Sequence, residues 1–367
     1  MVMKFRVERE VLAEALGAAA RVASTRNNAM PALSGVKLEV TGDQLMLSCT
    51  DNDLSVQFVL PVGGQADGVV VASAKLMSDI VRSMSEGKVT VETTGETVSV
   101  SSGRAQFTVP TFAATDFPNI VQASAPPVTL AANLFADALR QVVRAASSDM
   151  QRLALTGVLM SAEPDGLRLV ATDSYRLAVR DLPGSNILGH GEKVVIPSRA
   201  LNELQRLLAS GEEASLCLAG DRATFTVGQA TLSTSLLQIE FPNYRQLIQP
   251  NYPNSLTTAR EPLLEAIRRC RILARETTPV RLEMTATSLK LIVVTQDVGN
   301  TVEELDATMV GSDITVGFNP EYLAAGIEAV SGDEITIQTT DPIKPAVLRG
   351  VGAPDYLYLV MPQRLTN

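Results

Sequence analysis

The chain repeats one sequence pattern three times at a spacing of 122 residues. Residues 45–51 and 167–173 each alternate apolar with other side chains and end in Thr-Asp, and residues 289–295 alternate in the same way before Gln296-Asp297. A period of two that ends in turn-forming residues predicts a strand followed by a corner. Three copies at one spacing indicate a fold built from three similar units.

Two apolar stripes at helical spacing accompany each strand pattern. They predict one set of helices over residues 11–23, 134–146 and 263–273, and a second set over residues 76–84, 201–208 and 323–330. Ser73, Ser198 and Asn319 precede the second set, in the place of N-cap residues. We therefore expect an α+β fold of three repeated domains, each with two helices packed on antiparallel sheet.

The first two units end alike. Phe117-Pro118-Asn119 and Phe241-Pro242-Asn243 are each followed by a loop that contains prolines, as a linker would. These loops predict domains over residues 1–125, 126–251 and 252–367. A period of this length is too long for a solenoid repeat.

Few residues of the chain suit catalysis or metal binding. The only histidine, His190, lies between two glycines, and the three cysteines, Cys49, Cys217 and Cys270, are far apart in the sequence. We therefore expect reduced thiols and neither a nucleophilic triad nor a zinc site. The sequence also lacks a glycine-rich phosphate-binding loop.

Asp51 and Asp53 form the one carboxylate pair that suggests a Mg²⁺ site or a hydrolase. The same position recurs as Asp173 and Asp297 without a second matched acid, which favours a repeated turn residue. We therefore expect no enzymatic activity, no metal and no cofactor. The hydrolase alternative predicts that Asp51→Asn abolishes an activity.

Charge is segregated along the chain. The formal charge is −9 at pH 7, yet five of six windows that enclose the predicted helices and their ends are net positive, namely residues 9–26, 74–88, 133–152, 197–210 and 260–275. The last of these contains five arginines against two glutamates. Basic helices in an acidic chain are typical of a surface that contacts a polyanion. Aromatic residues make up only 4% and tryptophan is absent, so contact with a phosphate backbone is expected rather than reading of bases.

Three motifs in order add a specific likeness. Residues 171–179 (ATDSYRLAV), residues 241–245 (FPNYR) and residues 361–365 (MPQRL) are similar to the A-T-D-x-x-R-L-A-V, F-P-x-Y-R and M-P-x-R-L stretches of one family. Together with the triplication, the whole chain resembles the bacterial DNA polymerase III β subunit, the DNA sliding clamp.

The resemblance implies a head-to-tail homodimer whose six domains close a ring around duplex DNA, with helices toward the hole. Such a ring slides without sequence specificity and confers processivity on the replicative polymerase. The DNA-contacting residues implied by position are Arg26, Lys75, Arg140, Arg144, Arg152, Arg199, Arg206, Arg268, Arg269 and Arg275.

The resemblance also implies a cleft between the second and third domains that binds short peptides of partner proteins. Apolar side chains near a chain end, methionine among them, suit such a surface. A C-terminal strand that merely completes a sheet is the alternative. The residues implied are Leu155, Thr172, Ser174, Tyr175, Arg176, Leu177, Pro242, Arg245, Leu247, Ile343, Pro345, Val360, Met361, Pro362, Gln363, Arg364 and Leu365.

Two departures from the family's pattern fall in this cleft. Ser174-Tyr175 stands where some members have Gly-His, and Gln363 stands where some have Met. We expect these residues to change which peptides fit.

At the dimer contact the resemblance implies that Ile272 and Leu273 face Phe107 and Val109, unless they belong to the core of their own helix. The resemblance also implies charged residues at this contact, which could form ion pairs across it: Lys75, Arg104, Glu303, Glu304 and Asp306.

The partners implied are double-stranded DNA, the DNA polymerase III catalytic subunit, the clamp loader, and other polymerases and repair proteins. No run of about 18 apolar residues is present to span a membrane, and we expect a cytoplasmic protein. The rival interpretation is an acidic scaffold that binds peptides and never encircles DNA.

Overall fold

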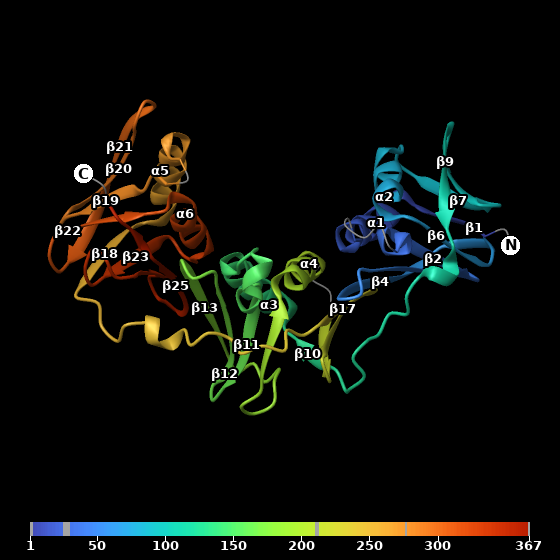
Figure 1. Ribbon diagram of the computed structural model, residues 1–367, viewed down its shortest axis with the longest axis horizontal. Helices are drawn as coiled ribbons and strands as arrows, with labels where there is room; N and C mark the ends of the chain where they lie inside the picture. The colour runs from blue at the N-terminus through green and yellow to red at the C-terminus, as the bar shows by residue number, and fades with distance from the viewer. Residues whose placement is uncertain (1–2, 25–29, 210–212, 276, 366–367) are drawn as a thin grey trace. The chain divides into compact units, whose positions relative to one another are not determined.

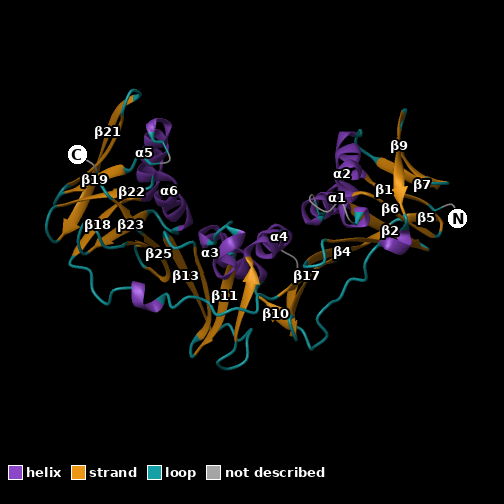
Figure 2. Ribbon diagram, viewed as in Figure 1, coloured by secondary structure: helices purple, strands orange, loops and turns teal. Residues whose placement is uncertain are grey.

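The computed structural model describes residues 3–24, 30–209, 213–275 and 277–365 (Figure 1). The chain forms two compact units, and each unit contains one antiparallel sheet of 13 strands. Unit 1 comprises Met1–Asn133 and Arg199–Leu236, and unit 2 comprises Leu134–Ser198 and Leu237–Asn367. Figure 2 shows helices on one face of the strands in each unit.

The sheet of unit 1 has the order β10-β15-β16-β17-β4-β3-β2-β6-β9-β8-β7-β1-β5. Its strands are β1 Lys4–Glu8, β2 Gly35–Thr41, β3 Gln44–Thr50, β4 Leu54–Pro61, β5 Gly63–Ala66, β6 Gly68–Ser73, β7 Lys88–Thr94, β8 Thr97–Ser102, β9 Ala105–Phe112, β10 Val128–Leu130, β15 Ala214–Ala219, β16 Arg222–Val227 and β17 Ala230–Ser235. Its helices are α1 Arg9–Val22, α2 Ala74–Ser83 and α4 Ser198–Leu208, with short 3₁₀ turns η1 Pro31–Ser34 and η2 Ala114–Asp116.

The sheet of unit 2 has the order β14-β11-β12-β13-β25-β24-β23-β18-β21-β20-β19-β22-β26. Its strands are β11 Gly157–Glu163, β12 Gly166–Thr172, β13 Arg176–Pro183, β14 Lys193–Pro197, β18 Asn254–Ala259, β19 Val280–Met284, β20 Ser288–Thr295, β21 Gly299–Val310, β22 Ile314–Phe318, β23 Glu334–Thr339, β24 Ala346–Gly350, β25 Ala353–Val360 and β26 Pro362–Gln363. Its helices are α3 Ala132–Val142, which begins at the unit boundary, α5 Arg260–Leu273 and α6 Pro320–Ala329, with 3₁₀ turns η3 Val143–Ala145, η4 Met150–Leu155 and η5 Arg245–Leu247.

The repeated α+β pattern is confirmed. Each of the six predicted helices corresponds to one of α1 to α6, and the three alternating segments form β3, β12 and β20. In α1 the buried side chains include Leu12, Leu16 and Ala19, at the three- and four-residue spacing of one helix face. Two of the expected N-caps act as such, because Ser73 accepts a hydrogen bond from the N–H of Leu76 and Asn319 accepts from Glu321 and Tyr322.

The Thr-Asp corners have the turn geometry that the sequence suggested. The Asp51 carboxylate accepts the N–H groups of Asp53 and Leu54, and the Asp173 carboxylate accepts those of Tyr175 and Arg176. Within the described residues no cluster of acidic, histidine and cysteine side chains could hold a metal ion. Both carboxylates therefore have a structural role in shaping the corner.

Each sheet continues from one sequence repeat into the next. In unit 1, β17 pairs with β4, so that Ala230 lies opposite Phe58, and in unit 2, β25 pairs with β13, so that Tyr356 lies opposite Arg180. The middle repeat contributes strands to both sheets, which is why the two compact units do not follow the three repeats. The domain ranges 1–125, 126–251 and 252–367 stay a prediction.

All three cysteines are free and buried. Burial raises the pKa of the Cys49 thiol to about 12 and that of Cys270 to about 11, and the Cys217 thiol donates a hydrogen bond to the Ala125 carbonyl at 3.1 Å. None of the described helices is long and apolar enough to cross a membrane.

We expect the native protein to resist thiol alkylation. Reaction requires access to the sulfur, which burial denies to all three cysteines, and it requires the thiolate, which the raised pKa of Cys49 and Cys270 makes scarce at pH 8. Iodoacetamide followed by mass spectrometry should leave Cys49, Cys217 and Cys270 unmodified in buffer and should modify all three in denaturant. Rapid alkylation of any one of them in buffer would contradict the burial described.

Candidate functional sites

The cations predicted to contact DNA lie on the helices and just after them. Of the ten, Arg26 falls outside the described residues. The others occupy α2 (Lys75), α3 (Arg140), η3 (Arg144), η4 (Arg152), α4 (Arg199 and Arg206), α5 (Arg268 and Arg269) and the segment after α5 (Arg275). All nine side chains are exposed or half-buried, so the helix layer presents them to solvent.

Most of these cations are already neutralised by a carboxylate of the same chain. The ion pairs are Arg140–Asp137, Arg144–Glu328, Arg152–Asp149, Arg199–Asp51, Arg206–Glu203, Arg268–Glu328 and Arg269–Glu303. Lys75 and Arg275 have no ion pair among the residues that the structure describes. The basic character inferred from helix charges is therefore reduced by acids of the same helix, Asp137 and Glu203, and by acids of other elements, Asp51, Glu303 and Glu328.

Two glutamates each hold arginines from different elements. Glu328 of α6 accepts from Arg144 at 2.9 Å and from Arg268 at 3.1 Å. Glu203 of α4, which is nearly buried, accepts from Arg21 of α1 at 2.7 Å and also from Arg206. These carboxylates connect neighbouring helices and limit the freedom of the arginines to contact phosphates.

A second candidate surface, in unit 2, surrounds the corner between β12 and β13. Tyr175, 54% exposed, stacks on Tyr322 of α6 with ring centroids 6.1 Å apart, and the Arg176 guanidinium lies 4.7 Å from the same ring centroid. Arg176 also donates to Asp173 at 2.9 Å. The N–H of Met361 donates to the Tyr175 carbonyl at 2.8 Å, which fixes the C-terminal segment beside this corner.

The predicted peptide-binding residues divide by burial. Leu155, Thr172, Leu177 and Val360 are buried and can only support a surface from below. The exposed members are Ser174, Tyr175, Pro242, Arg245, Leu247, Ile343 and Arg364, and the half-buried members are Arg176, Pro345, Met361, Pro362, Gln363 and Leu365. Several apolar members thus remain accessible to solvent.

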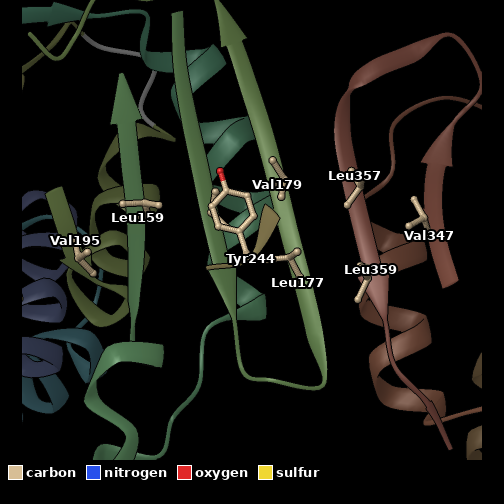
Figure 3. Packing of buried hydrophobic residues seen from close by; sticks show 9 residues of the cluster. Leu159, Leu177, Val179, Val195, Tyr244, Val347, Leu357 and Leu359 are labelled. Atoms are coloured by element: carbon tan, nitrogen blue, oxygen red, sulfur yellow. The ribbon is translucent and has the colours of Figure 1, made fainter. Parts of the chain in front are cut away.

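The segment that carries FPNYR crosses the face of the unit 2 sheet opposite its helices. Tyr244 packs in a buried cluster with Leu177, Val179 and Leu359, and Figure 3 shows its ring beside β13, the strand that carries Leu177 and Val179. Met361 packs against the same cluster. The structure therefore packs the FPNYR segment and the C-terminal segment against one cluster that includes β13.

Arg245 points elsewhere. Its guanidinium donates to Glu163 at 2.6 Å, and Glu163 pairs with Gly166 at the hairpin end of β11 and β12. Ser174 follows the opposite end of β12, whose first residue is Gly166 and whose length is about 20 Å at 3.3 Å per residue. In this conformation Arg245 does not join the corner around Tyr175.

Two strands present unpaired edges. Residues 105–110 of β9 pair with β8 on one side, while β6 pairs only with Thr111 and Phe112. Residues 299–306 of β21 pair with β20, while β18 pairs only with residues 307–310. Both edges leave a row of backbone groups open on the described sheets, and such edges are templates for pairing with another chain.

The residues predicted at the dimer contact lie on or next to β9 and β21, or on the neighbouring helix α5, except for Lys75, which lies on α2. Ile272 is 79% exposed and Phe107 is 41% exposed, whereas Leu273 is half-buried. Val109 departs from the expectation, because it is 5% exposed and packs into the core of unit 1. Among the charged residues, Arg104, Glu304 and Asp306 are exposed, and Lys290 lies 3.7 Å from Glu304.

Glu303 is already engaged within its own chain. Arg269 donates two hydrogen bonds to it, each 2.8 Å long, and these bonds lower the pKa of the Glu303 carboxyl and raise that of the Arg269 guanidinium. Glu303 therefore stays ionised and paired before any partner arrives.

Comparison with known proteins identifies the family. Residues 3–121, 129–243 and 245–364 match the N-terminal, central and C-terminal domains of the DNA polymerase III beta subunit. The chain belongs to this family. Over 100% of both chains it is 33% identical to the beta sliding clamp of Streptomyces coelicolor, and over 99% of its own length it is 30% identical to all of the beta sliding clamp of Escherichia coli K12.

Solved sliding clamps share the fold along the whole chain. A structure of the sliding clamp from Bartonella birtlesii bound to griselimycin covers 100% of both chains with a TM-score of 0.91 at 28% identity. The C. crescentus beta sliding clamp covers 99% of both chains with a TM-score of 0.90 at 27% identity. The protein is a DNA sliding clamp, a processivity factor for DNA polymerase that catalyses no reaction itself.

Sequence reasoning missed one aromatic residue of the clamp. Tyr322 lies in the first turn of α6, where it stacks on Tyr175 and covers Arg176. Aromatic residues are scarce in this chain, so a tyrosine directly after the Asn319-Pro320 helix start was the available signal.

Proposed function

We propose that the clamp closes as a head-to-tail ring of two chains, with β9 of one chain paired to β21 of its partner. The observation that carries the proposal is the pair of open strand edges, one at each end of the chain's sequence. An interface between two different surfaces closes after two copies when the rotation allows it, so assembly stops at a ring. Exposed Ile272 and Phe107 supply apolar contact beside the paired edges.

We propose that the nine described helix cations, with Arg26, contact the phosphate backbone of the encircled duplex. Ion pairs within the chain neutralise seven of them, which keeps each phosphate contact weak. Weak contacts suit a ring that is held by topology and slides, because no single phosphate retains it. Lys75 and Arg275, which lack such a pair among the described residues, are the cations readiest to bind.

Removal of the shared carboxylate should strengthen DNA binding. Glu328→Gln releases Arg144 and Arg268, and every additional bond to a phosphate steepens the fall of log affinity with log salt by about 0.9. We expect a steeper slope, by about 1 to 2, in fluorescence anisotropy on a duplex oligonucleotide across a salt series. Glu334→Gln, an exposed residue on β23, removes the same charge and should leave the slope unchanged. Equal slopes for both variants would contradict the proposal.

We propose that the surface around Tyr175, Tyr322 and Met361 binds short peptides of partner proteins. It combines exposed aromatic and apolar side chains with a buried floor, and the C-terminal segment is fixed beside it. The partners proposed are the DNA polymerase III catalytic subunit, the clamp loader, and other polymerases and repair proteins. Because it acts on bacterial DNA, we propose that the clamp works in the cytoplasm.

Retention on circular DNA tests the ring. The clamp is loaded by its matched loader onto a nicked circular plasmid, and the complex is passed through gel filtration before and after a single cut linearises the plasmid. A topologically held ring elutes with the circle and is lost from the linear form. Equal retention on both forms would overturn the proposal, and so would retention on neither while a control clamp loads normally.

A further inference from the structure

Unit 1 contains a cavity of about 210 Å³ between α1, α4 and the strands β4, β16 and β17. Its walls are formed mainly by the buried side chains of Ala15, Phe58, Leu60 and Val227. For scale, an apolar cavity of about 150 Å³ is large enough to bind benzene. The space is therefore sufficient for one aromatic ring.

The internal repeat explains why this space is open. Ala230 of β17 lies opposite Phe58 of β4, and the matching position of unit 2 is Tyr356 of β25, which lies opposite Arg180 of β13. Tyr356 is 2% exposed, and its hydroxyl donates to the Gln141 carbonyl of α3 at 3.3 Å. Where unit 2 carries a phenol ring between helix and sheet, unit 1 carries only a methyl group.

The mouth of the cavity has polar and apolar groups. Glu14 and Gln229 lie at its rim and can accept a hydrogen bond, and Val11 beside them is 39% exposed. A carboxylate at the rim favours a ligand that ends in a donor and disfavours an acidic one. A phenol meets both conditions, because its ring is apolar and its hydroxyl donates.

We propose that this cavity binds the tyrosine side chain of a partner protein, in the space that Tyr356 fills within unit 2. The open rim admits a side chain from outside, and the walls bury its ring. None of these residues belongs to β9, to β21 or to the surface around Tyr175. The proposal therefore goes beyond the proposed ring and its peptide surface, and it stands if either of them fails.

The test uses the full-length protein and 4-fluorophenol, followed by ¹⁹F NMR. We expect saturable binding in the millimolar range, as suits a ligand of so few atoms. Ala230→Tyr should fill the cavity as Tyr356 does and weaken binding by at least about tenfold. Thr226→Tyr is the matched control, because Thr226 is exposed on β16 and its side chain points to the other face of the sheet from Val227.

A second variant guards against misfolding of the first. Ala15→Leu fills the same cavity from the α1 side, and circular dichroism identifies the variant that folds. Binding that survives in a folded cavity-filling variant would overturn the proposal, as would absence of saturable binding to the unmodified protein.

The source of the phenol is tested with N-acetyltyrosinamide against N-acetylphenylalaninamide. If the natural ligand is a partner's tyrosine, N-acetyltyrosinamide should bind at least as tightly as 4-fluorophenol. N-acetylphenylalaninamide should bind several-fold more weakly, and Ala230→Tyr should abolish the binding of both amides. Binding of 4-fluorophenol without binding of N-acetyltyrosinamide would instead show a pocket for small molecules and would overturn the assignment to a protein partner.

Discussion

Ile272→Asp should convert the dimer to a monomer and abolish retention on circular DNA. Ile272 is 79% exposed in the last turn of α5, so an aspartate there is solvated in the free chain and should change folding stability by no more than about 0.5 kcal/mol. In the proposed ring the same carboxylate would be buried without a partner, which costs several kcal/mol per ion. Each ring contains two such contacts, so both are weakened together.

Sedimentation equilibrium at micromolar concentration measures the mass, and the plasmid assay measures retention. Val121→Asp is the matched control, because Val121 is 56% exposed on the segment between η2 and β10, belongs to none of the predicted sites and receives the same aspartate. It should stay dimeric and stay on the circle. A dimeric Ile272→Asp variant that still loads would show that α5 lies outside the interface.

The elements of the fold could be predicted from the sequence because their signals are local. The spacing of Leu12, Leu16 and Ala19 marks α1, and the alternation over residues 45–51 marks β3. The pairing of β17 with β4 and of β25 with β13 could not be predicted. It joins residues more than 170 positions apart and depends on which edges the helices leave free.

The residue types of the candidate sites could be predicted from the sequence, whereas the burial and the ion pairs of those residues could not be predicted as well. The resemblance assigned Val109 to the dimer contact, but its alternation with Thr108 and Pro110 places it in the core. Arg245 and Glu163 are 82 positions apart, and their ion pair follows only from the course of the crossing segment. The same holds for Arg144 and Glu328, so the charge of a helix window overstates the charge that the helix offers to DNA.

Core packing offers a second test with a large expected effect, this time on the stability of the chain itself. Gly326 lies in the middle of α6, and a Cβ added there would lie 2.5 Å from Cε1 of Tyr358 and 2.8 Å from Cδ1 of Leu348. Tyr358 cannot yield easily, because it is 2% exposed and its hydroxyl donates to the Tyr322 carbonyl at 2.9 Å. Gly326→Ala should therefore destabilise unit 2 by about 1 to 3 kcal/mol, in spite of alanine's better helix propensity.

Gly17 provides the opposite case in α1. A Cβ there meets the Nη2 of Arg82, the far end of an exposed and flexible side chain that can move aside. Gly17→Ala should therefore stabilise unit 1 by about 0.5 to 1 kcal/mol, the ordinary advantage of alanine over glycine within a helix. Thermal unfolding of both variants measures the difference. If the two changes shifted the midpoint in the same direction, the close approach of α6 to Tyr358 could not be what demands glycine at residue 326.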